Sequence, residues 1–239
     1  MIALLPNSGR GTRMGSATRE HPKCMVELPD GETIIARQVH QLLDCGVTEA
    51  VVTTGPFADL LREHLEGLHS GMRFTFVHNP RYAETNYIYS MYLARQALTS
   101  QDIISLHGDL VMDSQVLRSL ARSAQSVVAV DRAAELPEKD FKAEITNGGR
   151  VRAIGIDRFG ADCAAGQPAY KFLAKDFDRW MQEIVRFIDR GEDTCYAENA
   201  FNAAWEEIPL FALDVQGLTC KEIDTPEDYA AVTPTLPPR

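Results

Sequence analysis

The sequence predicts an α/β fold in which a mostly parallel sheet is covered by helices on both faces. Three observations support this fold class. Strand-like apolar runs alternate with segments of helical periodicity. The length of 239 residues suits one such domain with a small appendage, and 45% hydrophobic and 24% charged residues are ordinary values for a globular chain. Ligands bind such sheets at the carboxyl ends of the strands. We therefore expect the loops after Leu5, Thr54, His78 and His107 to converge.

The elements of the first half have clear boundaries. Residues 2–5 form an apolar strand that stops at Pro6. Residues 33–45 place apolar side chains on one helical face, and Gly46 provides the C-terminal stop. The next expected elements are a strand at 50–55, a helix at 58–69 and a strand at 73–78.

The second half is expected to carry strands, a glycine-turn hairpin and two helices. The apolar stripe of the first of these helices is predicted to be core rather than a cofactor site. The helix after Asp224 begins with Thr225-Pro226, since proline is favoured at the first helical position. The expected elements are strands at 103–111 and 127–131, a hairpin at 141–156, a helix at 176–189 and a frayed Pro-rich tail from Thr233.

The loop after the first strand, residues 7–15, contains three glycines and two arginines. Glycines let backbone N–H groups approach phosphate oxygens, and arginines offer planar forks of charged donors. The P-loop pattern G-x-x-x-x-G-K-[ST] is absent, and Gly9, Gly11 and Gly15 are spaced one residue too long for G-x-G-x-x-G. The loop is predicted to bind phosphate, and a glycine-rich surface turn is the alternative.

This loop reads G-x-G-T-R-M and is followed by Pro22-Lys23. The pattern resembles the N-terminal signature of nucleotidyltransferases, which make sugar nucleotides and CDP-alcohols. Asn7-Ser8, preceded by Pro6, replaces the alanine pair that lies against the base in that family, so the choice of base stays open. The matching residues are Leu5, Gly9, Gly11, Thr12, Arg13, Met14, Pro22 and Lys23.

The resemblance implies a particular version of the α/β fold. It is a Rossmann-like mixed, mostly parallel sheet flanked by helices, of the glycosyltransferase-A-like kind, with a small β-rich acceptor lobe. One nucleotidyltransferase domain is expected over residues 1–232, with the acceptor lobe at roughly 132–205, followed by a tail at 233–239.

Residues 79–94 carry a second resemblance, to the N-x-x-Y-x-x-x-N-x-x-Y-S-x-x-x-A segment of phosphocholine and aminoalkylphosphonate cytidylyltransferases. Thr85 or Asn86 can cap a helix whose free N–H groups face a nucleotide. Tyr89 shares a helix face with Tyr92, and the alternative is that both fill the core between helix and sheet. The matching residues are Asn79, Tyr82, Asn86, Tyr89, Ser90 and Ala94.

Two aspartates are predicted to bind Mg²⁺. Asp109 follows an apolar strand, and Mg²⁺ prefers one or two carboxylates together with phosphate oxygens and water. A turn aspartate is the alternative for this residue. The segment at residues 222–228 resembles the family's closing E-I-D-T-x-E-D motif, which implies that Asp224 binds the same Mg²⁺.

The resemblance also implies roles in binding CTP. Arg13, assisted by Arg10, is expected to hold the β- and γ-phosphates. Lys23 is expected to contact the α-phosphate, and Arg13 and Lys23 are the expected catalytic residues. The full expected nucleotide site is Leu5, Asn7, Ser8, Gly9, Arg10, Gly11, Thr12, Arg13, Lys23, Gly55, Asn79, Thr85, Asn86, Ser90 and Gly108.

Four residues are expected to contact the acceptor: Tyr89, Lys142, Tyr196 and Glu198. Tyr196 and Glu198 offer an alkylammonium a cation–π contact and a charge, respectively. Trp205 is a further candidate. The alternatives are exposed hairpin charges for Lys142 and a helix start with solvated charges for Glu198.

Composition excludes several other classes of protein. A net charge of −10 disfavours nucleic-acid binding, which needs a broad basic surface. The five cysteines form no metal-ligand spacing and suggest a reducing compartment. Without a signal peptide or a long apolar stretch, we expect a cytoplasmic protein that does not enter a membrane. A homodimer stays open.

The expected function is transfer of CMP from CTP to a small phosphate or phosphonate acceptor, with release of pyrophosphate. Phosphocholine, phosphoethanolamine, 2-aminoethylphosphonate and related phosphonates are the expected acceptors. A sugar-1-phosphate nucleotidyltransferase is one alternative, and a member acting on an amino acid or unusual phosphonate is another. A nucleotide-binding domain without turnover is the alternative from a different class.

Overall fold

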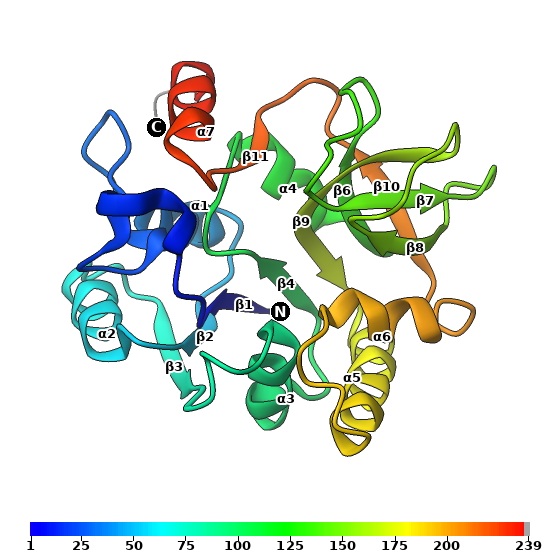
Figure 1. The fold of residues 1–239 in the computed structure, drawn as a ribbon, viewed down its shortest axis with the longest axis horizontal. Coiled ribbons are helices and arrows are strands. Elements are labelled where there is room, and N and C mark those ends of the chain that lie inside the picture. The colour runs from blue at the N-terminus through cyan, green and yellow to red at the C-terminus, as the bar shows by residue number, and fades with distance from the viewer. Residues whose placement is uncertain (237–239) are drawn as a thin grey trace.

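The computed structural model describes residues 1–236, apart from the side chains of Thr12, Ser16 and Ala17. Its main sheet contains nine strands, seven of them in the order β10-β6-β9-β4-β1-β2-β3 (Figure 1). All neighbouring pairs along this order are parallel except those made by β9, which is antiparallel to β4 and β6. The predicted mixed, mostly parallel sheet is therefore confirmed.

The first half of the chain has the expected alternation of strands and helices. Asn86 caps α3 by accepting a hydrogen bond from the Tyr87 N–H, as one of the two predicted caps. Gly46 follows the C-cap of α1 and has a φ of +78°, which glycine adopts without steric cost. The elements are β1 (Ile2–Asn7), α1 (Ile34–Asp44), β2 (Glu49–Thr54), α2 (Ala58–Gly67), β3 (Arg73–His78), α3 (Tyr87–Leu98) and β4 (Ile103–Leu106).

The second half departs more from expectation. The strand expected at 103–111 is two strands, because the chain turns at His107, where the Leu110 N–H donates to the His107 carbonyl over 3.1 Å. The hairpin was expected, whereas α4, β9 and β10 were not. The elements are β5 (Leu110–Met112), α4 (Ser114–Arg122), β6 (Ser126–Asp131), β7 (Lys142–Ile145), β8 (Val151–Gly155), β9 (Cys163–Phe172), α5 (Ala174–Asp189), α6 (Ala197–Ala203), β10 (Leu210–Asp214), β11 (Cys220–Glu222) and α7 (Pro226–Val232).

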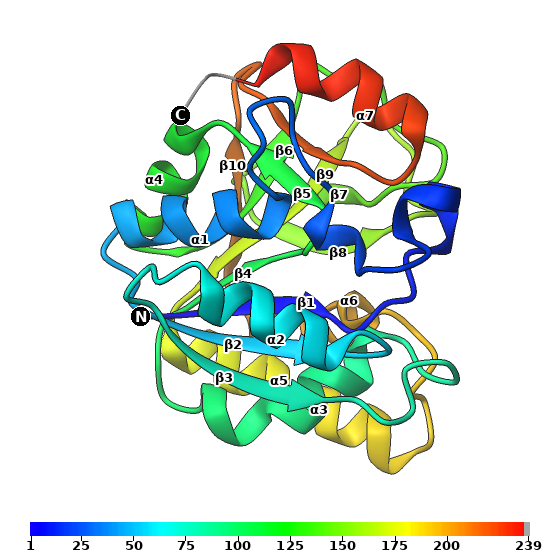
Figure 2. The same ribbon diagram turned by 90° about the vertical axis from the view of Figure 1, so that its left-hand side faces the viewer.

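Two hydrophobic cores lie on opposite faces of the main sheet. Alternate residues of one strand point to opposite faces, so in β1 Leu4 belongs to one core and Leu5 to the other. The Leu4 core is covered by α3, α5 and α6, and the Leu5 core by α1, α2 and α4. Figure 2 shows α3 and α5 below the sheet and α1 and α4 above it. Trp180 and Ile184 of α5 are buried in the first core, as expected.

A second, two-stranded sheet joins the middle of the chain to its C-terminal part. β11 pairs antiparallel with β5, with Glu222 opposite Leu110. Immediately beyond this pair, the Ile223 N–H donates to the carbonyl of Asp109 over 2.9 Å. This sheet therefore brings the segment that contains Asp224 beside the turn that contains Asp109.

The hairpin of β7 and β8 is continuous with the main sheet, because β7 pairs with β9 from Lys142↔Ala165 to Glu144↔Cys163. Gly149, in the turn of this hairpin, has a φ of +80°.

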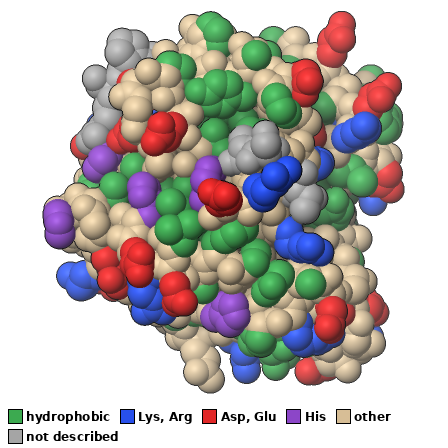
Figure 3. All heavy atoms as spheres, turned by 60° about the vertical axis from the view of Figure 1, so that its left-hand side comes forward, with side chains coloured by type: hydrophobic (Ala, Val, Ile, Leu, Met, Phe, Trp, Pro, Cys, Tyr) green, Lys and Arg blue, Asp and Glu red, His purple; other side chains and the backbone are tan. Residues whose placement is uncertain are grey.

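On the face in Figure 3, acidic and basic side chains are interspersed among apolar ones. Within residues 1–236, no helix combines the length and the apolar character needed to cross a membrane.

Candidate active site

A cavity of about 440 Å³ lies where β1 and β4 end. Most of its lining comes from three places: the loop after β1, the turn after β4, and the segment before β7. The carboxyl ends of neighbouring parallel strands thus form the site, as the fold class predicts. The lining residues are Pro6, Asn7, Ser8, Gly9, Arg10, Gly11, Arg13, Pro22, Lys23, Cys24, Tyr82, Tyr87, His107, Gly108, Asp109, Lys139, Asp140, Phe141, Ile156, Tyr196, Glu222 and Asp224.

The predicted phosphate loop forms one wall of this cavity. Gly11 has a φ of +62°, and a Cβ added there would lie 3.2 Å from the Lys23 Cβ. A side chain at this position would be strained and crowded, so glycine is required. The Arg13 side chain is 65% exposed, and its guanidinium pairs with the Asp224 carboxylate over 2.8 Å. The loop therefore presents an accessible cation beside a carboxylate. The Thr12 side chain is outside the described residues.

The centre of the site is an ion-pair cluster around Lys23. Its Nζ donates to Asp109 Oδ2 over 2.6 Å and also to Asp224 Oδ1. Asp224 additionally binds Arg13, so two cations and two carboxylates form one network. The three residues with the most specific predicted roles, Lys23, Asp109 and Asp224, are thus brought together by segments far apart in the sequence.

The electrostatics of this cluster favour the charged forms of Lys23 and Asp109. Burial alone would lower the pKa of Lys23, but the carboxylates of Asp109 and Asp224 outweigh burial and raise it. Burial would raise the pKa of Asp109, but the charges of Lys23 and His107 lower it. An ammonium has three N–H donors, and two of them contact carboxylates here. Among the described residues the third donor of Lys23 has no acceptor, so it is available to an anionic group in the cavity.

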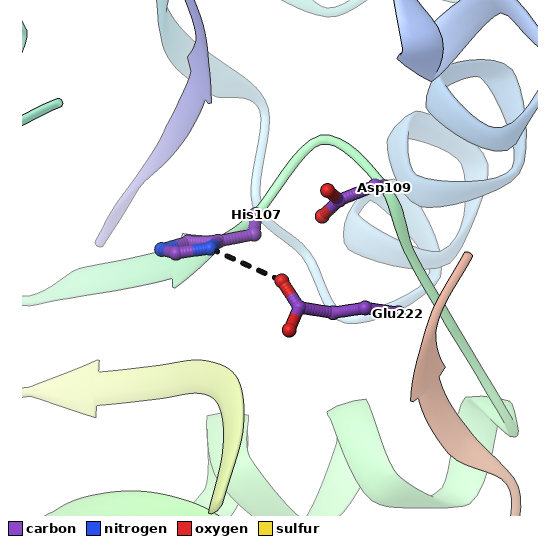
Figure 4. A group of neighbouring side chains, drawn as sticks. All are labelled: His107, Asp109 and Glu222. Carbon is purple, nitrogen blue, oxygen red and sulfur yellow. Dashed lines mark ion pairs between the residues drawn. The ribbon is translucent and has the colours of Figure 1, made fainter. Parts of the chain in front are cut away.

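His107, Asp109 and Glu222 form a second cluster that the sequence analysis missed. Figure 4 shows the imidazole of His107 at the end of β4 facing the Glu222 carboxylate on β11, with Asp109 on the turn above. His107 Nδ1 lies 3.4 Å from Glu222 Oε1, and one ligand atom from each of the three residues lies within 4.8 Å of the others. The available sequence signals were the strand-end His107 and the first residue of the E-I-D motif.

Burial and mutual contact together set the pKa values of Glu222 and His107 in this second cluster. Burial and the neighbouring Asp109 charge raise the pKa of Glu222, although contact with His107 acts in the opposite direction. Burial would lower the pKa of His107, but the hydrogen bond to Glu222 and its charge raise it. Glu222 and His107 therefore stabilise each other in a buried part of the cavity lining, where the low dielectric strengthens their interaction.

The expected Mg²⁺ site consists of the carboxylates of Asp109 and Asp224. Carboxylate oxygens are the ligands that Mg²⁺ prefers, and Asp109 and Asp224 both line the cavity. Asp109 Oδ1 is buried and has no hydrogen-bond partner among the described residues. An unpartnered buried carboxylate oxygen is costly unless a cation or a donor contacts it. Asp109 therefore fits a ligand of a divalent cation, whereas the two oxygens of Asp224 pair with Arg13 and Lys23 in this structure.

Among the described residues, three predicted nucleotide-binding residues, Asn79, Thr85 and Ser90, lie outside the cavity lining, behind the phosphate loop, whereas Ser8 of that loop lines the cavity. The Ser8 and Ser90 hydroxyl oxygens are 2.6 Å apart, and Asn79 Nδ2 donates to Ser90 over 3.0 Å and to Thr85 over 3.1 Å. Ser8, Asn79 and Ser90 are buried. This chain of hydrogen bonds attaches the loop to α3, so these residues hold its shape.

Close packing against the phosphate loop explains two predicted glycines, against its backbone at Gly55 and against the Asn7 side chain at Gly108. A Cβ at Gly55 would lie 2.2 Å from the Ser8 carbonyl oxygen, and one at Gly108 would lie 1.8 Å from Asn7 Oδ1. Real Cβ contacts are never this short, so neither position accepts a larger residue without movement. Gly55 lets the chain after β2 approach the phosphate loop, and Gly108 makes room for Asn7.

Among the described residues, the predicted nucleotide-binding residues Leu5, Gly55, Thr85 and Asn86 lie outside the cavity lining.

The side of the cavity that contains Tyr196, one of the predicted acceptor residues, is aromatic. The rings of Phe141 and Tyr196 meet edge to face with centroids 5.0 Å apart, and the Tyr87 ring meets the His107 ring in the same way at 5.0 Å. Tyr196 was predicted from sequence, whereas Tyr87 and Phe141 were not. Tyr196 is 37% exposed, which leaves its ring accessible at the cavity edge.

The other three predicted acceptor residues lie outside the lining among the described residues. Tyr89 stacks against Tyr92 with ring centroids 6.0 Å apart. Lys142 is fully buried, donates to the Pro137 carbonyl over 2.7 Å and lies 4.1 Å above the Phe159 ring. The alternative of an exposed hairpin charge for Lys142 is therefore wrong. Glu198 is also buried, so the alternative of a solvated helix start is wrong.

Comparison with known families gives one extended match. Residues 6–192 match the family described as the MobA-like NTP transferase domain. This range contains the phosphate loop, Lys23 and Asp109, and it ends before the β11 segment that contains Asp224.

Individual relatives and solved structures agree with that match. CMP-5'-(3-aminopropyl)phosphonate synthase of Streptomyces rubellomurinus is 34% identical over 131 residues, which cover 54% of this chain but only 20% of that protein. Choline-phosphate cytidylyltransferase of Streptococcus pneumoniae is 25% identical over 238 residues, covering 96% of this chain and 95% of that protein. A solved structure of a CTP:phosphocholine cytidylyltransferase from Streptococcus pneumoniae matches with a TM-score of 0.80 and 20% identity over 98% of both chains. At that identity the likeness shows the fold alone.

Proposed function

Because the chain belongs to the MobA-like NTP transferase family, we propose that it transfers CMP from CTP to a small acceptor that carries a phosphate or phosphonate group. The observation that carries this proposal is the cluster of Arg13, Lys23, Asp109 and Asp224. The cluster joins a glycine-rich phosphate loop to an aromatic pocket. A nucleotide and a second, smaller substrate can meet there. The likeness to relatives named for CMP and cytidylyl transfer supports CTP as donor.

The proposed reaction is a direct displacement at phosphorus. An acceptor oxygen forms a new bond to the α-phosphorus of CTP, while the bond from that phosphorus to the bridging oxygen breaks. Pyrophosphate leaves with the electron pair of the broken bond. The attacking oxygen is already anionic, so the step needs no general base. The protein must align two anions that repel each other and must neutralise their charge.

Each cation of the site has a role in this displacement. The exposed guanidinium of Arg13, with Arg10, binds the departing β- and γ-phosphates. The free N–H donor of Lys23 contacts the α-phosphate and stabilises the charge that develops there. Asp109 and Asp224 hold Lys23 in place and provide ligands for Mg²⁺. When bound, Mg²⁺ would supply further positive charge and so would reduce the repulsion between the two anionic substrates.

The second substrate occupies the aromatic side of the cavity. Tyr196 and Phe141 offer ring surface, and the carboxylate of Glu222 lies in the floor. Aromatic faces and carboxylates together suit an alkylammonium group. Phosphocholine, phosphoethanolamine and 2-aminoethylphosphonate carry such a group at one end and an attacking anion at the other. A sugar phosphate carries no cation for this pocket.

The test is pyrophosphate release with Mg²⁺ present. The four nucleoside triphosphates are crossed with phosphocholine, phosphoethanolamine, 2-aminoethylphosphonate, 2-hydroxyethylphosphonate and glucose-1-phosphate. The proposal predicts turnover with CTP and at least one of the small acceptors. Turnover with glucose-1-phosphate alone would replace it by a sugar-phosphate nucleotidyltransferase. CTP binding with no pyrophosphate release in any combination would indicate a binding domain.

A further inference from the structure

Glu198 is a buried carboxylate that lies behind the acceptor side of the cavity. It belongs to α6 and is 1% exposed. Its Oε1 accepts a hydrogen bond from the Tyr170 hydroxyl over 2.8 Å, and its Oε2 accepts one from the Tyr87 hydroxyl. Among the described residues it forms no ion pair with Lys or Arg. Each oxygen of the buried carboxylate therefore has one hydroxyl donor, and both donors are neutral groups.

Tyr87 connects this carboxylate to the cavity. The ring of Tyr87 lines the cavity and meets the His107 ring, while its hydroxyl is held by Glu198 on the far side. Glu198 therefore fixes one wall of the acceptor pocket although it does not line that pocket itself. The carboxylate lies one side chain, that of Tyr87, away from the cavity.

We propose that Glu198 is a positioning residue that makes the acceptor pocket select a cationic acceptor over a neutral one of the same shape. It acts through two features of the geometry. It holds the Tyr87 ring in place, and it adds a buried negative charge behind that ring, where low dielectric strengthens attraction to an ammonium group. This inference rests on the proposed function, because it concerns the choice of that reaction's second substrate.

The test compares two acceptors that differ in charge but little in size, 2-aminoethylphosphonate and 2-hydroxyethylphosphonate. The ratio of their kcat/KM values is measured for the wild type and for Glu198→Gln, which keeps the side-chain shape. The ratio should fall roughly tenfold in the variant, as expected for one unit charge several ångströms from an ammonium. KM for CTP should stay within about twofold. Tyr87→Phe should raise the KM of both acceptors, because the ring loses its anchor.

Glu183→Gln is the matched control. Glu183 is a buried glutamate of α5 that pairs with Arg179 and Arg186 and does not line the cavity. Its substitution should leave the acceptor ratio unchanged. If Glu198→Gln reduces turnover of both acceptors equally, Glu198 is only structural and the inference is overturned.

A binding measurement separates this inference from the proposed function. If the wild type releases no pyrophosphate with any acceptor, the proposed function fails. Calorimetric titration of the wild type and Glu198→Gln with the same two phosphonates then decides the inference. Preferential binding of the aminophosphonate by the wild type, lost in the variant, supports it. The same preference in both proteins, or none in either, overturns it.

Discussion

The backbone N–H of Ile223 donates a hydrogen bond to the carbonyl of Asp109 over 2.9 Å. This one contact fixes the relative position of two segments that lie far apart in the sequence, and it places Asp224 opposite Asp109. Lys23 then bridges both carboxylates. The arrangement of the charged cluster therefore depends on the small sheet of β5 and β11 as much as on the phosphate loop.

Lys23→Ala should lower kcat at least about 100-fold and change KM for CTP much less. The contact of Lys23 with the α-phosphate strengthens as charge develops in the transition state, so its loss affects turnover more than ground-state binding. Steady-state kinetics measure both constants. Lys221→Ala is the control, since the Lys221 side chain is 41% exposed and its one ion pair among the described residues is with Asp131. If Lys23→Ala turned over at the wild-type rate, the assigned role would be wrong.

Asp224→Asn and Glu222→Gln should separate the metal site from the acceptor pocket. Asp224→Asn should raise the Mg²⁺ concentration needed for half-maximal activity at least about tenfold, since a carboxylate binds Mg²⁺ better than an amide. Glu222→Gln should mainly raise the KM of the acceptor. Titrations with Mg²⁺ and with acceptor give the two constants. A larger shift in Mg²⁺ dependence for Glu222→Gln would instead point to the cluster of His107, Asp109 and Glu222 as the metal site.

The parts of the fold and of the candidate site that have distinctive local chemistry could be predicted from the sequence. The glycines and Lys23 form a recognisable pattern, and the E-I-D motif indicated Asp224. The pattern identified the family correctly. In contrast, β9 has no β-branched residue in its run Cys163–Phe172, and it is almost entirely buried. Neither alternation nor β-propensity marks such a strand, so its central position follows only from tertiary packing.

The surroundings of the predicted acceptor residues were the hardest to predict, because they too depend on tertiary packing. Lys142 and Glu198 are charged, and charged residues are seldom buried without partners. Here carbonyl groups and tyrosine hydroxyls satisfy them, and those partners come from distant segments. The cavity lining by Tyr87 and Phe141 depends in the same way on how α3 and the hairpin pack together.

Gly55→Ala should destabilise the fold by about 1–3 kcal/mol and raise KM for CTP, because its Cβ would overlap the Ser8 carbonyl oxygen at 2.2 Å. Backbone must move to relieve that overlap, and the phosphate loop would move with it. Gly67→Ala is the matched control, since a Cβ there meets nothing within 4 Å. Urea denaturation and kinetics measure the two effects. Equal stability of Gly55→Ala and the control would contradict the close packing.

Cys220 should react with iodoacetamide much more slowly than the three partly exposed cysteines at pH 8.5. Burial raises the pKa of Cys220 to about 12, so its reactive thiolate is scarce until the pH approaches that value. The partly exposed thiols are Cys45, Cys163 and Cys195. Mass spectrometry of peptides after timed labelling gives each rate, and labelling in urea should remove the difference. Fast labelling of Cys220 in the folded protein would show that the β5 and β11 sheet opens readily.

The most direct test of the central claim is ³¹P NMR of the products formed from CTP and 2-aminoethylphosphonate with Mg²⁺. The account predicts a CMP–phosphonate anhydride, with coupled resonances from its phosphonate and phosphate groups, and an equal amount of pyrophosphate. CTP hydrolysis to CMP and pyrophosphate with the phosphonate unchanged would contradict transfer to this acceptor. The same result with phosphocholine and phosphoethanolamine would contradict the proposed reaction.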